Sequence, residues 1–149
     1  MLFCSKKRKK KCGQAYPISR AFPPGFLLTF SHRDSSIISK QGRLSENLLF
    51  VELIRRNFKL GLDLFYYRTN NDKEVDFLCR KGHQIVQLVQ VCFDLSDPRT
   101  FKREMSALAT AAKELFCNDL LILTWDQEFS REENGYSVSI RPVWKWSLD

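Results

Sequence analysis

Residues 64–92 read LFYYRTNNDKEVDFLCRKGHQIVQLVQVC, and this stretch decides the fold of the chain. Three short runs, 64–68, 74–80 and 84–93, are rich in β-branched, aromatic and other apolar residues. The runs are separated by NNDK and KGH, which are typical of tight turns. We therefore predict three consecutive strands that are joined by two hairpins.

Asp76 stands in an otherwise apolar part of the second predicted strand. A carboxylate in such a place is costly unless it is paired, hydrogen-bonded or bound to a metal. Arg68 and Lys73 are candidate partners across the first hairpin, because opposite charges often pair between adjacent strands. The third strand brings Gln90 and Cys92 to the same face as Asp76, because side chains alternate along a strand.

Helices are predicted before and after this meander. Residues 42–57 repeat apolar residues at helical spacing, with Leu44, Leu48 and Val51 as the main core candidates and Leu49 and Ile54 as further ones. A second helix is predicted over residues 98–116, because Asp97 can cap it and a proline follows at its first position.

A fourth strand is predicted over residues 120–125, which are nearly all apolar, as in a strand that is buried on both faces. Together with residues 84–93 and the helix between them, it forms a right-handed βαβ unit with parallel strands. Residues 31–41 and 127–135 are expected to be loops, and residues 136–140 a further strand. This order predicts an α/β domain with an αβββαβ core, in which a mixed central sheet is flanked by helices.

The positive charge of the chain is concentrated near its N-terminus. The net charge is +7, but six of the 24 basic residues form one run, Lys6, Lys7, Arg8, Lys9, Lys10 and Lys11, which leaves 18 basic against 17 acidic residues. Such a run binds nucleic acid or anionic surfaces without sequence specificity, or it is simply a solvated terminus. We predict a disordered basic tail over residues 1–13 and a single domain over residues 14–149.

The apolar runs are too short for a membrane span or for the core of a signal peptide, so a cytoplasmic protein with no membrane partner is expected. The five cysteines lack the spacing of a zinc or redox motif, and free thiols are the simpler interpretation.

Two motifs make the prediction more specific. Residues 42–53 read GRLSENLLFVEL and residues 74–77 read EVDF. Together with the αβββαβ order they resemble the PD-(D/E)XK, or restriction-endonuclease-like, fold. More closely, residues 14–149 resemble a C-terminal domain of prokaryotic AAA-type ATPases that carries the label "domain of unknown function". The chain has no G-x-x-x-x-G-K-[ST] motif, so it is not expected to bind or hydrolyse ATP by itself.

The resemblance implies a site for Mg²⁺. Active nucleases of this fold hold the metal with an acid on the first helix, an aspartate on the second strand and a Glu-x-Lys pair on the third, and Mg²⁺ polarises the phosphate. Glu46 and Asp76 match the first two positions, whereas Gln90 and Cys92 stand in place of Glu-x-Lys. Glu46, Asp76 and Gln90 are therefore the candidate metal and catalytic residues. Glu46 could instead belong to a capping box or to the surface.

The expected function is that of a catalytically impaired, nuclease-like accessory domain of an AAA-type ATPase. It would act in recognition or assembly, with nucleic acid or the ATPase module as its partner. Lys102 is a further candidate for nucleic-acid contact, besides the basic tail. One alternative is a weak Mg²⁺-dependent endonuclease. Another is a regulatory protein-interaction domain that does not contact nucleic acid.

Overall fold

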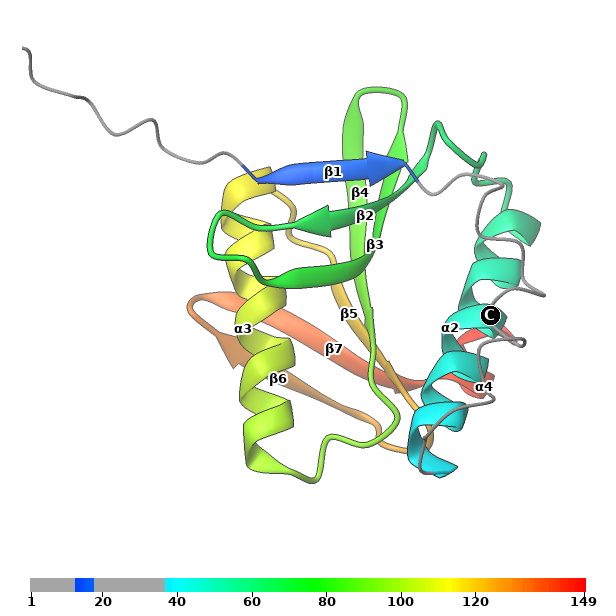
Figure 1. The fold of residues 1–149 in the computed structure, drawn as a ribbon, viewed down its shortest axis with the longest axis vertical. Helices are drawn as coiled ribbons and strands as arrows, with labels where there is room; N and C mark the ends of the chain where they lie inside the picture. The colour runs from blue at the N-terminus through cyan, green and yellow to red at the C-terminus, as the bar shows by residue number, and fades with distance from the viewer. Residues whose placement is uncertain (1–12, 18–36) are drawn as a thin grey trace, which may run out of the picture.

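In the part of the chain that the structure describes, a seven-stranded mixed sheet forms the centre, and helices cover both of its faces (Figure 1). The computed structural model describes residues 13–17 and 37–149, with only the backbone described over 37–44. The elements are β1 (Gln14–Pro17), α2 (Ile37–Arg55), β2 (Leu64–Arg68), β3 (Glu74–Lys81), β4 (Gln84–Val91), α3 (Pro98–Leu115), β5 (Leu120–Thr124), β6 (Phe129–Glu133), β7 (Tyr136–Pro142) and α4 (Val143–Trp146). The strand order is β1-β2-β3-β4-β5-β7-β6. The predicted mixed sheet with flanking helices is thus confirmed, while the predicted tail lies outside the described residues apart from Gly13.

The predicted meander is present. Strands β2, β3 and β4 pair antiparallel in sequence order, and Phe77 lies opposite Val89 and Leu78 opposite Leu88 in the β3–β4 ladder. The next residues along this ladder are Asp76 and Gln90. The two polar positions predicted to lie together are therefore on neighbouring strands.

The βαβ unit also has the predicted form. Strand β5 pairs parallel with β4, and Gln90 lies opposite Ile122. Helix α3 begins after Asp97, whose carboxylate accepts a hydrogen bond from the Thr100 N–H at 2.8 Å. This cap satisfies one of the free N–H groups at the helix start, and Pro98 fits the first turn because it has no N–H to satisfy.

Helix α2 differs from its prediction in both extent and orientation. It begins at Ile37, inside the stretch predicted as a loop, and continues through Gly42. A glycine inside a helix costs only about 1 kcal/mol, which packing of the later turns can outweigh. Leu48 and Val51, which were predicted to face the core, are exposed.

The buried face of α2 consists of Leu49, one of the further candidates, together with Phe50 and Leu53, whereas Ile54 is exposed. Both sets of apolar residues have helical spacing, so the sequence pattern alone could not decide which of them faces the sheet. The side chain of Leu44 lies outside the described part of the chain.

The sheet contains two strands that were not predicted. Strand β1 pairs with β2 at one edge, and β6 pairs with β7 at the other. The predicted loop over residues 127–135 is therefore wrong for β6, whose sequence FSREE is charged and almost wholly exposed. Charged side chains are typical of edge strands, where they discourage pairing with other chains, and they hide the strand from a search for apolar alternation.

The sheet separates two hydrophobic cores, one beneath α3 and one beneath α2 and α4 (Figure 1). The α3 core contains Leu78, Leu88, Met105, Leu108, Ile122 and Ile140, and the α2 core contains Leu49, Leu53, Phe77, Val89, Leu121 and Leu123. Leu78 of β3 and Leu88 of β4 thus face α3, and so does Val75, because the β2–β3 pairing shifts register between Val75 and Leu78. Gln90, two residues after Leu88, lies on the same side and lines the pocket beside α3.

Candidate functional site

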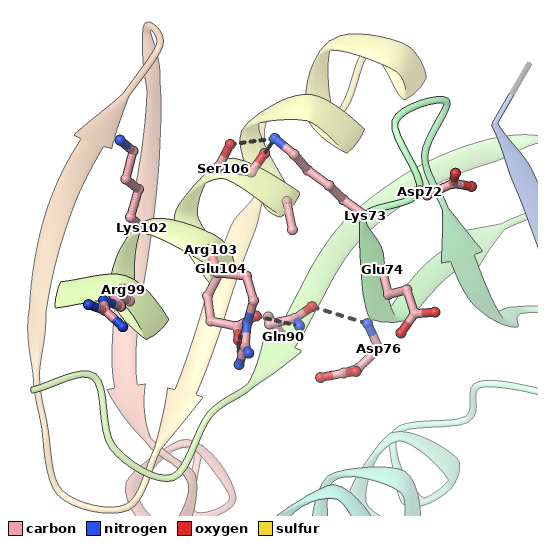
Figure 2. Close-up of a pocket in the computed structure, with 11 residues that line it drawn as sticks. Asp72, Lys73, Glu74, Asp76, Gln90, Arg99, Lys102, Arg103, Glu104 and Ser106 are labelled. Carbon is pink, nitrogen blue, oxygen red and sulfur yellow. Dashed lines mark hydrogen bonds and ion pairs between the residues drawn. The ribbon is translucent and has the colours of Figure 1, made fainter. Parts of the chain in front are cut away.

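A pocket of about 670 Å³ lies where β3 and β4 face the first turns of α3 (Figure 2). Its lining residues are Asp72, Lys73, Glu74, Asp76, Gln90, Arg99, Lys102, Arg103, Glu104, Ser106 and Ala107. The pocket thus brings together three sequence-predicted residues, Asp76, Gln90 and Lys102, with several residues that were not predicted.

Among the described residues, Asp76 is held by the backbone and not by a cation. Its Oδ2 accepts a hydrogen bond from the Val91 N–H at 2.9 Å, and its own N–H donates to Gln90 Oε1 at 3.2 Å. The two cations that were predicted as its partners, Arg68 and Lys73, interact with other groups. Arg68 pairs with Asp72 at 3.3 Å, and the Lys73 ammonium donates to the hydroxyls of Ser106 and Thr110.

The Asp76 carboxyl has an unusually high pKa. Burial raises this pKa to about 7, and the N–H of Val91 opposes the rise. The neighbouring carboxylates of Glu46, Glu104 and Glu74 raise the pKa further by repulsion. Asp76 therefore loses and gains its proton near neutral pH.

Gln90 connects Asp76 to a second buried acid. The Gln90 side chain is 7% exposed, and its Nε2 donates to Oε2 of Glu104 at 2.7 Å. Glu104 is 5% exposed, and its Oε1 accepts from Arg103 at 2.6 Å. Both ends of the Gln90 amide are thus occupied, one by the Asp76 N–H and the other by the Glu104 carboxylate (Figure 2).

Sequence reasoning missed Glu104. A signal was present, since Glu104 lies four residues before Leu108, on the apolar side of a strongly amphipathic helix. An acid in that stripe is either paired or functional. The preceding residue, Arg103, lies outside this apolar stripe and supplies the positive charge that pairs with Glu104.

Cys92 cannot replace the missing lysine. Its thiol donates to the carbonyl of Asp94 at 3.3 Å, and burial raises its pKa to about 11. The group is therefore neutral at physiological pH. Cys79, Cys92 and Cys117 are all free thiols, as predicted, and Cys4 and Cys12 lie outside the described residues.

The residues do not fit the Mg²⁺ site that the nuclease resemblance implies. No three His, Cys, Asp or Glu side chains are grouped to hold a metal ion anywhere in residues 13–17 and 45–149. Gln90 Oε1, the one amide oxygen proposed as a ligand, accepts the Asp76 N–H instead. Glu46 influences the Asp76 pKa, but it lies in the middle of α2, nine residues after Ile37, so it is not a capping-box residue.

The first turns of α3 carry the positive charge of the pocket. Arg99, Lys102 and Arg103 project from this helix, and Lys73 projects from the turn before β3 (Figure 2). Within the part of the chain that the structure describes, neither Arg99 nor Lys102 forms an ion pair. The predicted nucleic-acid contacts at 6–11 lie outside that part.

The fold and pocket define a mixed α/β domain with a buried amide–carboxylate network at its centre. Residues 41–144 match the model of a family described as a domain of unknown function, DUF4143. The chain belongs to this family.

The chain is also similar to an uncharacterized protein, MJ1544, of Methanocaldococcus jannaschii. The two are 36% identical over 129 residues, which cover 83% of this chain and 27% of the relative. The chain thus spans about a quarter of the length of the curated relative that it matches. No solved structure matches the chain. The described residues contain no helix that is long and apolar enough to cross a membrane.

Proposed function

We propose that this chain is a nuclease-like accessory domain of an AAA-type ATPase that lacks hydrolytic activity and acts in recognition, with nucleic acid as its partner. The αβββαβ order, the GRLSENLLFVEL and EVDF motifs and the match to a region of a much longer relative support this proposal.

The observation that carries the proposal is the position of Gln90. A hydrolytic site of this type needs negative ligands for the metal and a positive group where charge develops in the transition state. The Gln90 amide is neutral and donates a hydrogen bond to Glu104, while the Cys92 thiol is neutral. Losing one such stabilising group lowers a rate by about a hundredfold or more.

Hydrolysis is tested by incubating plasmid DNA with the purified protein and Mg²⁺ or Mn²⁺, beside Asp76→Ala. No cleavage above background is expected. Cleavage that disappears in Asp76→Ala would contradict the proposal and support the weak endonuclease. Cleavage that persists in Asp76→Ala indicates a contaminating nuclease.

Nucleic-acid binding is proposed to have two sources, the tail and the pocket. The tail, Lys6–Lys11, should supply most of the affinity for duplex DNA, because the rest of the chain is nearly neutral. Replacing its six basic residues by Gln should reduce the affinity and its salt dependence. The affinity that remains should depend on Arg99 and Lys102, and Lys113→Ala, on the last turn of α3, is the matched control.

A second candidate function is favoured by the exposed face of α2. Leu48, Val51 and Ile54 are 40–51% exposed and follow one side of the helix. Such a stripe suits a protein-interaction domain that regulates its ATPase module without contacting nucleic acid. This alternative predicts that Val51→Glu abolishes an effect of the domain on ATPase rate, whereas Arg99→Ala does not.

A further inference from the structure

The two sides of the pocket carry opposite charges. The α3 wall, which we define as Arg99 and Lys102, is positive, and the β3 wall, defined as Glu74 and Asp76, presents two carboxyl groups (Figure 2). Gln90 lies between them in the floor. Cations therefore line one side of the pocket, and carboxyl groups line the other.

The other charged groups of the pocket are already paired or hydrogen-bonded. Arg103 is bound to Glu104, Asp72 is bound to Arg68, and the Lys73 ammonium donates to hydroxyls. No ion pair joins the α3 wall to the β3 wall among the described side chains. Both walls line the pocket, and the charges of Arg99 and Lys102 remain available to a ligand within it.

The β3 wall offers hydrogen-bond acceptors to a ligand. The Tyr66 hydroxyl is hydrogen-bonded to the Glu74 carboxylate, which raises the Tyr66 pKa in addition to the effect of burial. A carboxylate has about four lone-pair sites, so both Glu74 and Asp76 can accept further hydrogen bonds after their internal ones. The ligand that fits must therefore present donors to β3 and an anionic group to α3.

A nucleotide has this distribution of groups. Its phosphate is anionic, and a guanine edge presents adjacent N–H donors that match the two oxygens of a carboxylate. The pocket volume, about 670 Å³, is within the usual range for small-molecule sites. We propose that this pocket binds a guanine nucleotide unit without metal, with its phosphate against Arg99 and Lys102 and its base against Glu74 and Asp76.

The unit could be a free nucleotide or part of a strand, and in the second case the inference rests on the proposed nucleic-acid function. The two sources share one chemistry. A free nucleotide is distinguished from a nucleotide within a strand by comparing the binding of GMP with that of the single-stranded oligonucleotides dT–dT–dG–dT–dT and dT–dT–dT–dT–dT. Binding to the full chain is measured in EDTA by isothermal titration calorimetry.

The expected order of affinity is GMP above AMP and CMP, and UMP weakest. The double variant Arg99→Ala, Lys102→Ala should weaken all four nucleotides by about tenfold or more, since hydrogen bonds to charged groups are the stronger kind. Glu74→Gln should reduce the preference for GMP over UMP about fivefold and leave UMP binding unchanged. Lys113→Ala and Glu132→Gln, which are exposed and outside the pocket, are the matched controls for charge.

The outcomes separate this inference from the proposed function. Oligonucleotide binding that ignores guanine and is unaffected by Glu74→Gln, together with no preference for GMP among the free nucleotides, overturns the inference and leaves the nucleic-acid function standing. Failure of GMP and of every oligonucleotide to bind, duplex DNA included, overturns both. Circular dichroism of each variant shows that the fold is retained, and Glu74→Gln is suitable for this purpose because Glu74 is exposed.

Discussion

Replacing Gln90 by Leu should destabilise the domain strongly, although the two side chains are similar in size. The substitution removes the donor to Glu104 Oε2, at 2.7 Å, and the acceptor of the Asp76 N–H, at 3.2 Å. A hydrogen bond to a charged group contributes about 1.5–3 kcal/mol and a neutral one about 1 kcal/mol, and the groups left behind are buried. The expected loss is about 2.5–4 kcal/mol, which lowers Tm by about 5–15 °C for a domain of this length.

A double-mutant cycle with Glu104→Leu isolates this interaction. When both partners become apolar, no buried polar group is left unsatisfied in the pair, so the double variant should be at least as stable as Gln90→Leu alone. Arg103 loses its partner in this variant at little cost, because its side chain is 72% exposed. The free energies of unfolding are measured by urea titration followed by circular dichroism.

The matched control is Gln87→Leu on the same strand. The Gln87 amide donates to the exposed carboxylate of Asp119, so its removal should change stability by no more than about 0.5 kcal/mol. Equal losses for Gln87→Leu and Gln90→Leu, or a double variant whose loss is the sum of the two single losses, would refute the reasoning about the buried network.

Three further predictions concern Asp76, α2 and the start of α3. Because the folded-state pKa of Asp76 is raised from 3.8 to about 7, the folded state binds the proton more tightly than the unfolded state, and Asp76 lowers stability as pH rises from about 4 to 7. The free energy of unfolding of Asp76→Asn, relative to that of the wild type, should therefore rise by on the order of 2–3 kcal/mol between pH 5 and pH 8. Parallel urea titrations in which this difference does not change with pH would contradict the prediction. Leu53→Ala should cost about 2–5 kcal/mol and Val51→Ala less than about 1 kcal/mol, and the reverse order by thermal unfolding would mean that α2 packs through the other face. Asp97→Ala should cost about 1 kcal/mol through loss of the cap, and hydrogen exchange at the Thr100 N–H should become faster; unchanged exchange would argue against the cap.

The sequence was sufficient for elements whose local pattern has one interpretation. The meander, the βαβ unit and the Asp97 cap were predicted because strand alternation, turn residues and capping residues agree at those positions. The start and the buried face of helix α2, and the existence of strand β6, were not predicted correctly, because they depend on contacts distant in sequence. The apolar residues of α2 occupy two faces, and only the packing of Leu49 and Leu53 beneath the sheet distinguishes them.

The pocket was predictable in part for the same reason. Alternation along β3 and β4 predicted Asp76 and Gln90 on neighbouring strands and on one face; the two residues lie on neighbouring strands and both line the pocket, and the backbone N–H of Asp76 donates to Gln90 Oε1. The sequence could not show that Gln90 would bind Glu104, because that contact joins a strand to a helix fourteen residues later. Nor could it predict the raised pKa of Asp76, which depends on burial and on carboxylates from two helices.

The central claim, that the pocket is not a metal-dependent hydrolytic site, is tested most directly by titrating the full chain with Mn²⁺ at pH 8, where Asp76 is largely ionised. Electron paramagnetic resonance of free Mn²⁺ provides the readout, with Asp76→Ala as the control. The account predicts no stoichiometric binding in the submillimolar range and identical titrations for the two proteins. One bound Mn²⁺ per chain that is lost in Asp76→Ala would contradict it.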